Sequence, residues 1–204
     1  EHLAGFCKNI HVTLEKDGSA TVEDDGRGVP VGMHQKGISA ARLVYTTLHA
    51  GGKFDDSAYK TSGGLHGVGS SVVNALSVYM DVQISREGYI HHDRYERGVP
   101  VVELEDGLLP TIGKTRKTGT KVNFLPDDTI FEKTKFRAEE VKSRLHETAY
   151  LNPELTIVFD DKRPDSQEHI EYHEPDGILG FIRDLNQKKE VLHDTIYFKG
   201  TAEG

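Results

Sequence analysis

YKTSGGLHGVGSSVVNAL, residues 59–76, places four glycines directly before an apolar run that has helical spacing. Glycine adopts backbone conformations that other residues avoid, and it lets a ligand approach the main chain closely. A glycine-rich loop that opens a helix is typical of an anion site formed by backbone N–H groups. From the glycines alone, the alternative is a flexible hinge before an ordinary core helix. The stretch therefore raises the hypothesis of a phosphate loop.

Two common phosphate loops do not match this stretch. The dinucleotide fingerprint runs G-x-G-x-x-G, whereas Gly64, Gly67 and Gly69 run G-x-x-G-x-G. The Walker loop requires a lysine after its last glycine, and Ser70 stands at that position. If the stretch binds phosphate, it is a loop of a third kind.

Length and composition narrow the class of protein. The chain has 204 residues, enough for one domain or one and a half, and its formal net charge is −8. This charge argues against a segment that grips nucleic acid alone. Cys7, the single cysteine, excludes an internal disulfide and is expected to be a small buried residue. With only short apolar runs and an N-terminus unlike a targeting signal, we expect a cytoplasmic protein without membrane segments.

The spacing of apolar residues predicts the secondary structure. Strands are expected at 9–14, from 20 to the DDG turn, and at 80–85, 89–96, 101–104, 120–125, 154–159 and 169–172. Helices are expected at 38–49 and near 70–77, 137–150 and 177–188, and long loops at 50–69 and 160–168. The strands from 80 to 125 suggest an antiparallel meander. Helices among antiparallel strands, without β-α-β alternation, predict an α+β two-layer sandwich with a mixed, largely antiparallel sheet.

A second motif, TVEDDGRGVP at 21–30, ends a strand with two aspartates followed by Gly26, Gly28 and Pro30. By itself the motif favours an ordinary turn with solvated carboxylates. Beside a phosphate loop, a carboxylate at a strand end could accept a hydrogen bond from the exocyclic amine of adenine. Such a charge-assisted bond contributes roughly 1.5–3 kcal/mol and would reject guanine, which has a carbonyl there. The two motifs together indicate an adenine-nucleotide site.

The motifs together resemble those of a known family. D-x-G-x-G at Asp24, Gly26 and Gly28, LHAGGKFD at 48–55, the glycine-rich stretch and TGT at 118–120 are similar to the ATPase domain of bacterial type IIA topoisomerases. The resemblance covers essentially the whole chain and is to the DNA gyrase B subunit, with the topoisomerase IV B subunit as the alternative. It implies the left-handed Bergerat (GHKL) fold, shared with heat-shock chaperone ATPases, mismatch-repair MutL and histidine kinases.

The resemblance also implies roles for individual residues. Asp24 would accept from the adenine amino group, partly through a water that Thr120 helps to hold, while Gly28 and Pro30 would line the base pocket. The segment from Gly63 to Gly69 would be the lid over the triphosphate. The cofactor-binding residues implied are Asp24, Gly26, Gly28, Pro30, Lys53, Tyr59, Lys60, Gly64, Leu65, His66, Gly67, Val68, Gly69 and Thr120. For Lys53, Tyr59 and Lys60 a solvated loop position stays open as the alternative.

An inhibitor site overlaps this pocket in the family. Arg27 and Arg86 correspond to arginines at the pocket mouth, where aminocoumarin-type inhibitors lie, and Glu1 corresponds to a glutamate that pairs with Arg27. The implied inhibitor-binding residues are Glu1, Asp24, Arg27, Gly28, Pro30, Arg86 and Thr120.

The resemblance places the family's catalytic glutamate and magnesium-binding asparagine before the position of Glu1. We therefore expect residues 1–204 to be the N-terminal ATPase domain without the family's first helical segment and the downstream transducer domain. No catalytic or metal residue is assigned here, and ATP hydrolysis by this chain alone is expected to be slow. The chain alone is expected to be a monomer.

For the complete protein, the resemblance implies ATP and Mg²⁺ as cofactors and strand passage in DNA as the activity. It implies the gyrase A subunit and DNA as partners, and a homodimer that forms on ATP. The alternatives are a topoisomerase IV protein, a chaperone or mismatch-repair ATPase, and a nonhydrolytic adenine-nucleotide module. The details of AGGKFD and YKTSGGLHGVG disfavour the chaperone and repair ATPases.

Overall fold

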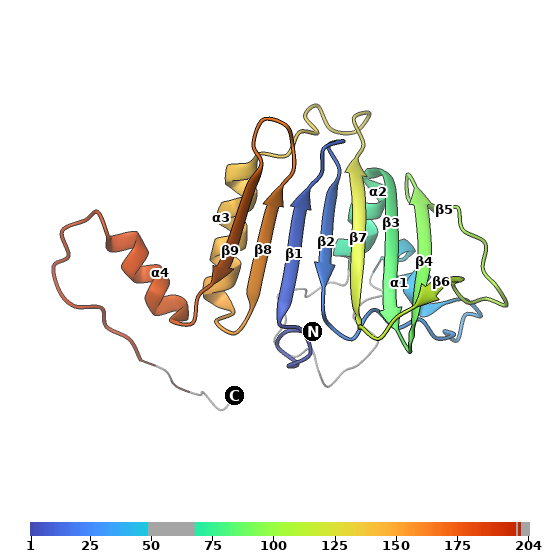
Figure 1. Cartoon of the computed structure of the whole chain (residues 1–204), viewed down its shortest axis with the longest axis horizontal. Coiled ribbons are helices and arrows are strands. Elements are labelled where there is room, and N and C mark those ends of the chain that lie inside the picture. The colour runs from blue at the N-terminus through green and yellow to red at the C-terminus, as the bar shows by residue number, and fades with distance from the viewer. Residues whose placement is uncertain (49–67, 199, 201–204) are drawn as a thin grey trace.

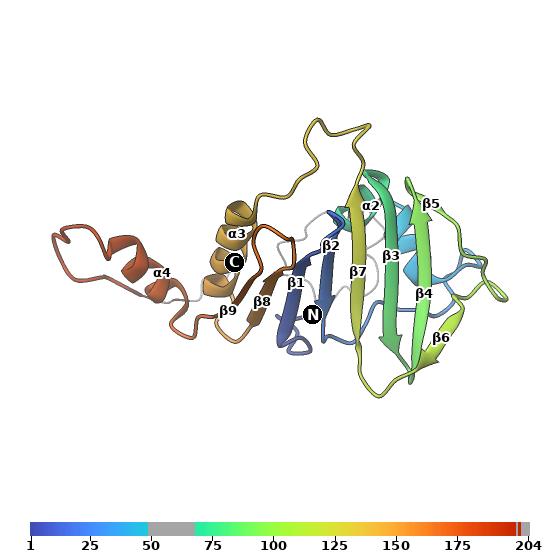
Figure 2. The same ribbon diagram turned by 45° about the horizontal axis from the view of Figure 1, so that its top comes forward.

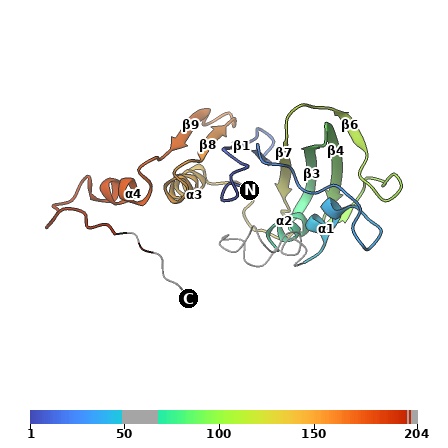
Figure 3. The ribbon, with the colours of Figure 1, turned by 90° about the horizontal axis from the view of Figure 1, so that it is seen from below.

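A computed structural model describes residues 1–48, 68–198 and 200. In these residues a nine-stranded sheet carries helices α1 (Ala40–Thr46), α2 (Gly69–Ala75) and α3 (Ala138–Leu151) on one face (Figures 1 and 3). Helix α4 (Gly177–Asn186) lies beyond the end of the sheet, next to α3 (Figure 2). The predicted α+β class with one sheet and one helical layer is confirmed. No helix among the described residues has the length and apolar character needed to cross a bilayer.

The sheet is mixed and largely antiparallel, as predicted. Its order is β5-β4-β3-β7-β2-β1-β8-β9, and β6 pairs with β4 off this path. β1 and β8 pair in parallel, whereas the other pairs are antiparallel. The strands are β1 (Asn9–Leu14), β2 (Ala20–Asp24), β3 (Ser77–Arg86), β4 (Tyr89–Glu96), β5 (Val99–Pro100), β6 (Thr111–Lys114), β7 (Gly119–Pro126), β8 (Thr156–Asp161) and β9 (Glu168–His173).

Turn chemistry in the sequence positions two of the hairpins. Between β1 and β2, the Asp17 carboxylate accepts from the backbone N–H of Ser19 at 3.0 Å, and Gly18 has a φ of 88°. Between β3 and β4, Glu87 and Gly88 have φ values of 56° and 85°, the left-handed pair that a two-residue hairpin turn requires. KDGS at 16–19 and REG at 86–88 predict these turns, and the structure confirms both.

Three predictions of secondary structure are corrected. Residues 101–104 are not a strand, because the Val102 carbonyl accepts from the Arg42 side chain at 2.7 Å instead of from a neighbouring strand. The short edge strands β5 and β6 were missed, since both are mostly exposed and β6 contains Gly113. The meander is wrong as well: β7 returns past the hairpin to pair with β3, while β5 and β6 take the outer edge of β4.

The apolar core has two parts, one beneath helices α1 and α2 and one beneath helix α3. Beneath α1 the buried cluster comprises Val31, Ala41, Tyr45, Met80, Val82, Ile84, Tyr95 and Leu109. Beneath α3 two further clusters comprise Cys7, Ala149, Leu155 and Ile157, and Val12, Leu14, Ala20 and Phe159. The centre of the sheet, at β2 and β7, lies between these parts, and Val22 on β2 is 37% exposed.

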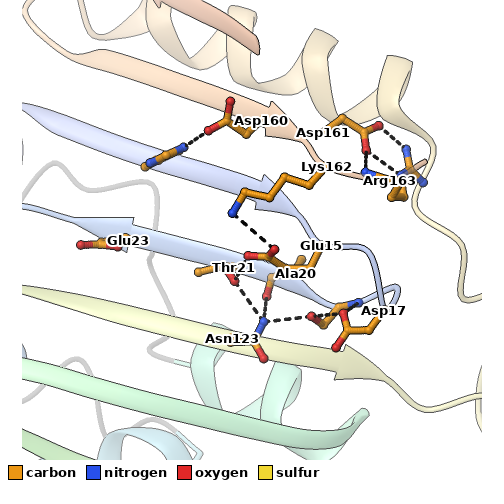
Figure 4. Close-up of polar contacts among 12 residues, drawn as sticks. Glu15, Asp17, Ala20, Thr21, Glu23, Asn123, Asp160, Asp161, Lys162 and Arg163 are labelled. Carbon is orange, nitrogen blue, oxygen red and sulfur yellow. Dashed lines mark hydrogen bonds and ion pairs between the residues drawn. The ribbon is translucent and has the colours of Figure 1, made fainter. Parts of the chain in front are cut away.

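The opposite face of the sheet carries polar side chains that bond across the strands (Figure 4). Asn123 on β7 donates to the Thr21 hydroxyl on β2 at 3.0 Å, and Thr21 donates to Glu15 at 2.9 Å. Lys162, just after β8, forms an ion pair with Glu15 at 3.4 Å. This polar network holds the inner strands in register and leaves the helical face for the site.

Candidate nucleotide site

A cavity of about 720 Å³ opens on the helical face, over the centre of the sheet. The strands β2, β3 and β7 form its floor, α1 and α2 form its walls, and the segment after β2 closes one side. It is lined by Glu1, Val22, Asp24, Arg27, Gly28, Val29, Pro30, Val44, Tyr45, Gly69, Ser70, Val73, Met80, Arg86, Thr120, Val122 and Phe124. Its size is that of small-molecule sites, which are mostly apolar with a few convergent polar groups.

Asp24, the last residue of β2, is the carboxylate of the floor. Its register partner on β7 is Thr120, and its Oδ1 accepts from the backbone N–H of Gly26 at 2.8 Å. Burial raises the pKa of Asp24, and the nearby charges of Glu1 and Asp25 raise it further. A carboxylate in this setting gains from a ligand that brings a hydrogen-bond donor.

The neighbouring Asp25 has a different environment, although it is adjacent in sequence. It accepts from the backbone N–H groups of Lys8 and Asn9 at 2.8 and 2.9 Å, and from the Asn9 side chain at 2.7 Å. Although burial opposes the effect, these donors lower the pKa of Asp25. Asp25 ties the start of β1 to the end of β2, whereas Asp24 lines the cavity.

Glycine is required at two positions of the DDGRG motif. A Cβ on Gly26 would lie 2.8 Å from Asp24 Oδ1. Gly28 has a φ of 78°, and a Cβ there would lie 2.9 Å from the Ser85 carbonyl oxygen and 3.1 Å from that of Gly119. Thr120 Oγ1 accepts from the backbone N–H of Val29 at 3.2 Å, so the segment after Gly28 is held against β7. The glycines let this segment fold closely around the carboxylate.

Two arginines lie at the mouth of the cavity. The Arg27 guanidinium forms a two-pronged pair with Glu1, with N···O distances of 3.0 and 2.9 Å. These hydrogen bonds lower the pKa of Glu1 to about 2. Arg86 Nη1 donates to the Gly28 carbonyl at 2.7 Å and so connects the end of β3 to the glycine turn. The structure thus brings Glu1, Arg27 and Arg86 together along the same cavity as Asp24.

The predicted lid falls mostly on residues outside the described part of the chain: Lys53, Tyr59, Lys60, Gly63, Gly64, Leu65, His66 and Gly67. Of its two described residues, Val68 is the N-cap of α2, and Gly69 begins α2 and lines the cavity. Gly26 and Val68 do not line the cavity, whereas Gly28, Pro30 and Thr120 do. The binding roles of all these residues stay predictions.

The sequence reasoning missed the apolar walls. Val22 and Val122 are register partners at the centre of the floor, and Val44, Tyr45 and Val73 project from α1 and α2. Alternation along the strands and the apolar stripes of the two helices did identify these positions as inward-facing. That signal is the same for a core residue and for a cavity wall, so it could not separate the two.

A larger cavity of about 980 Å³ lies between α2, β7 and α3 and shares Val73 and Phe124 with the first. Its walls are mainly apolar, and two of its four cations, Arg137 and Arg163, are paired with Glu140 and Asp161. Asp24, Thr120 and Arg86 converge on the smaller cavity, which makes it the candidate nucleotide site.

Residues 1–130 match the family model described as histidine kinase-, DNA gyrase B- and HSP90-like ATPase. The chain belongs to this ATPase family. The ATPase-family resemblance seen in the sequence is confirmed. The whole chain also aligns with the crystal structure of the 43K ATPase domain of Thermus thermophilus gyrase B in complex with an aminocoumarin. That alignment has a TM-score of 0.82 and 35% identity and covers 50% of that chain.

Curated members of the family give similar agreement along the sequence. The chain is 49% identical to the B subunit of DNA topoisomerase 4 from Streptococcus pneumoniae serotype 4 over 205 residues, covering all of this chain and 31% of that protein. It is 48% identical to the B subunit of DNA gyrase from Archaeoglobus fulgidus over 204 residues, covering all of this chain and 32% of that protein. The chain therefore spans about a third of the length of these relatives.

Proposed function

We propose that this chain is the nucleotide-binding part of the ATPase domain of a DNA gyrase B subunit, where ATP binding and hydrolysis drive strand passage and negative supercoiling. The observation that carries the proposal is Asp24, a carboxylate of raised pKa at the floor of a largely apolar cavity. The family match and the gyrase B relatives support the same function.

In this proposal, Asp24 accepts from the exocyclic amine of adenine, and Thr120 helps to hold a bridging water. The ring lies between the apolar side chains of the floor and of α1. Guanine presents a carbonyl oxygen to the carboxylate, so binding it would leave two acceptors facing each other without a proton. The site therefore selects adenine over guanine nucleotides through one hydrogen-bond donor, the exocyclic amine of adenine.

The phosphates are assigned to the α2 side of the cavity, where Gly69 and Ser70 line it. The segment 63–69 is proposed as their lid, with Lys53, Tyr59 and Lys60 beside it. Mg²⁺ is proposed to bind together with ATP in the complete ATPase domain, because this ion is usually held by one or two carboxylates and the substrate phosphates. Residues 1–48, 68–198 and 200 contain no group of three or more His, Cys, Asp and Glu side chains able to hold a metal, and no metal ligand is assigned among them.

Hydrolysis by residues 1–204 alone is proposed to be slow. The carboxylates among the described cavity residues are Glu1 and Asp24, and each has another task. Glu1 is paired with Arg27, and Asp24 is assigned to adenine. Loss of a general base typically costs about 10²–10⁴ in rate.

For the complete protein we propose the partners that the family implies. They are the gyrase A subunit, DNA, a second copy of the same protein when ATP is bound, and aminocoumarin-type inhibitors. A cytoplasmic location and a monomeric state of residues 1–204 alone belong to the same proposal.

A topoisomerase IV B subunit is the second candidate, favoured by 49% identity to the Streptococcus pneumoniae protein. DNA supercoiling by the complete protein with its partner separates the two, because negative supercoiling is expected of gyrase. A nonhydrolytic adenine-nucleotide module is the third candidate. ATP hydrolysis by a version extended at the N-terminus would exclude it.

Calorimetric titration with ADP tests the site itself. Asp24→Asn removes the carboxylate and is expected to weaken ADP binding roughly 10- to 150-fold, the range of a charge-assisted hydrogen bond. Asp25→Asn is the matched control, because its side chain bonds Lys8 and Asn9 outside the cavity. Equal losses in the two variants, or unchanged binding in Asp24→Asn, would contradict the adenine assignment.

A further inference from the structure

One buried side chain joins the two helices that form the walls of the nucleotide cavity. Asn74 on α2 is 1% exposed, and its Nδ2 donates to the backbone carbonyl of Tyr45 on α1 at 2.9 Å. The two helices contact each other on the same face of the sheet (Figure 3). Among the residues that the structure describes, this is the one hydrogen bond found between α1 and α2.

The carbonyl that Asn74 binds lies in the last turn of α1. Carbonyls in that turn have no N–H partner within the helix and need one from elsewhere. The Leu43 carbonyl accepts from the Thr47 N–H at 2.9 Å, which is the local solution at a helix end. Tyr45 receives its partner from the neighbouring helix instead. The same bond therefore completes the end of α1 and fixes the position of α2.

Both ends of this bond belong to segments that line the nucleotide cavity, although Asn74 itself does not line it. The wall residues are Val44 and Tyr45 on α1, and Gly69, Ser70 and Val73 on α2. Asn74 directly follows Val73 in the chain, and its acceptor is the main chain of Tyr45. A displacement at this bond therefore changes the separation of the two walls.

The second polar atom of Asn74 indicates that the amide is not there for stability alone. Its Oδ1 is buried and has no hydrogen-bond partner among the described residues. A buried acceptor without a partner typically costs more than a neutral hydrogen bond contributes to folding. An unsatisfied group of this kind in a folded protein calls for an explanation, and local conflicts with stability are expected near functional sites.

We propose that Asn74 is a positioning residue that sets the separation of the α1 and α2 walls for the phosphate end of the nucleotide. It acts through Gly69 and Ser70, the cavity residues at the start of its own helix. The inference rests on the proposed function, which places the base against α1 and the phosphates on the α2 side. Asn74 lies in the glycine-rich stretch that identified the family, but neither the motif nor the resemblance gave it a role.

The physical reason is pre-organisation. A ligand that contacts both walls binds best when their separation is already fixed, because it then orders little of the protein on binding. ADP contacts both walls in the proposed site, whereas adenosine contacts the floor and α1. Loss of the bond between the helices should therefore weaken the binding of ADP more than that of adenosine.

The test compares ADP and adenosine on the full 204-residue chain, with ADP titrated by calorimetry and adenosine measured by competition with ADP. Asn74→Leu keeps the shape of the side chain but removes the donor, and Asn74→Ser is too short to reach α1. Each is expected to lower the ratio of ADP affinity to adenosine affinity about two- to tenfold, the range of one neutral hydrogen bond. Circular dichroism of each variant checks that the fold is retained.

Ser77→Ala is the matched control. Ser77 is also 1% exposed, and its hydroxyl donates to the Val73 carbonyl of α2 at 2.6 Å, but it makes no bond to α1 and does not line the cavity. A merely structural loss at α2 would therefore appear in this variant too, whereas the positioning role predicts the parent ratio of affinities.

The outcomes separate this inference from the proposed function. A parent ratio of affinities in both Asn74 variants, or an equal fall of the ratio in Ser77→Ala, would overturn the positioning role and leave the nucleotide site intact. Loss of the fold in both Asn74 variants would overturn it as well, because the residue would then be structural. A parent chain that binds ADP no better than adenosine would also overturn it, and a parent that binds neither would overturn the proposed function.

Discussion

The cavity floor around Asp24 and the buried cluster around Asp93 lie on the same face of one sheet, but their carboxylates have different partners. Asp93 on β4 is 1% exposed, accepts from the Arg42 guanidinium at 3.0 and 2.7 Å, and accepts from the Tyr95 hydroxyl at 2.6 Å. Asp24 accepts from the Gly26 N–H, and the charges that act on it are those of other carboxylates. Tyr45 lies near both carboxylates: burial raises its pKa, and the two charges raise it further.

The comparison shows what a buried carboxylate contributes in each setting. The charge of Asp93 is balanced by Arg42 and bonded on both oxygens, so it is part of the fold. It fixes α1, whose Val44 and Tyr45 form a cavity wall. The charge of Asp24 is buried beside charges of its own sign, so a ligand that donates to it relieves a cost already present in the folded protein.

The largest effect is expected on stability, at Asp93. Asp93→Ala leaves Arg42, whose side chain is 11% exposed, without its counter-charge, and should lower the free energy of unfolding by about 3–5 kcal/mol. Urea denaturation at pH 7 measures the change. Asp81→Ala is the control on the open face of the same hairpin, where Asp81 bonds His92 at 2.8 Å. It should lose about 1 kcal/mol or less. Equal losses of unfolding free energy in Asp93→Ala and Asp81→Ala would contradict the distinction between the buried and the open face of the sheet.

The next effect is the pH dependence of ADP binding. As the pH falls through the raised pKa of Asp24, the carboxylate is protonated and adenine loses its charged acceptor. The affinity should therefore decrease toward the roughly 10- to 150-fold weaker binding expected for Asp24→Asn. Calorimetry from pH 7.5 to pH 4 measures this trend. Because phosphate itself titrates near pH 6, Asp24→Asn supplies the ligand's own pH dependence, and a parallel trend in the two proteins would contradict the role of Asp24.

Part of this site could be predicted from the sequence because it is encoded locally. Asp24 and Gly28 follow from one motif at a strand end, and the TGT motif places Thr120 on the neighbouring strand. The hairpin at 86–88 follows from its turn residues. Because side chains alternate along a strand, the adjacent His91 and His92 are predicted to face opposite sides of the sheet. In the structure His92 bonds Asp81 on the open face, while Nε2 of His91 is buried.

The rest depends on contacts between distant segments. Nothing local in β7 specifies that it pairs with β3 on one side and β2 on the other, which is what puts Thr120 beside Asp24. The same holds for Arg42 and Asp93, which are 51 positions apart. Val101 and Val102 look like a strand by composition, yet they form a loop because Arg42 binds the Val102 carbonyl. In these segments, tertiary contacts override the local secondary-structure propensity.

Asp24→Asn and Asp25→Asn should change stability in opposite directions, each by about 1 kcal/mol or less. The pKa of Asp24 is raised above its ordinary 3.8, so its ionised form costs stability at neutral pH, and removing the charge should stabilise the fold. The pKa of Asp25 is lowered, so its stabilisation is present above 3.8 and is lost as the pH falls through its folded value. Denaturation at pH 7 and at pH 3 measures both, and the two differences should shrink at the lower pH. The same sign for both variants at pH 7 would contradict the comparison.

The smallest effect on stability is expected at Glu1, and it connects the cavity mouth to the floor. The Glu1–Arg27 pair is partly exposed, with side-chain exposures of 29% and 40%, so Glu1→Gln should cost about 1 kcal/mol or less. That contribution is present above the ordinary Glu1 pKa of 4.5 and is lost as the pH falls toward about 2.

The charge of Glu1 also helps to raise the pKa of Asp24. Glu1→Gln should therefore move the pH midpoint of ADP binding downward, while Glu87→Gln, which changes a more exposed partner of Arg86, should leave it in place. An unchanged midpoint in Glu1→Gln would show that burial and the charge of Asp25 set the pKa of Asp24 without Glu1, and Glu1 and Asp24 would then titrate independently.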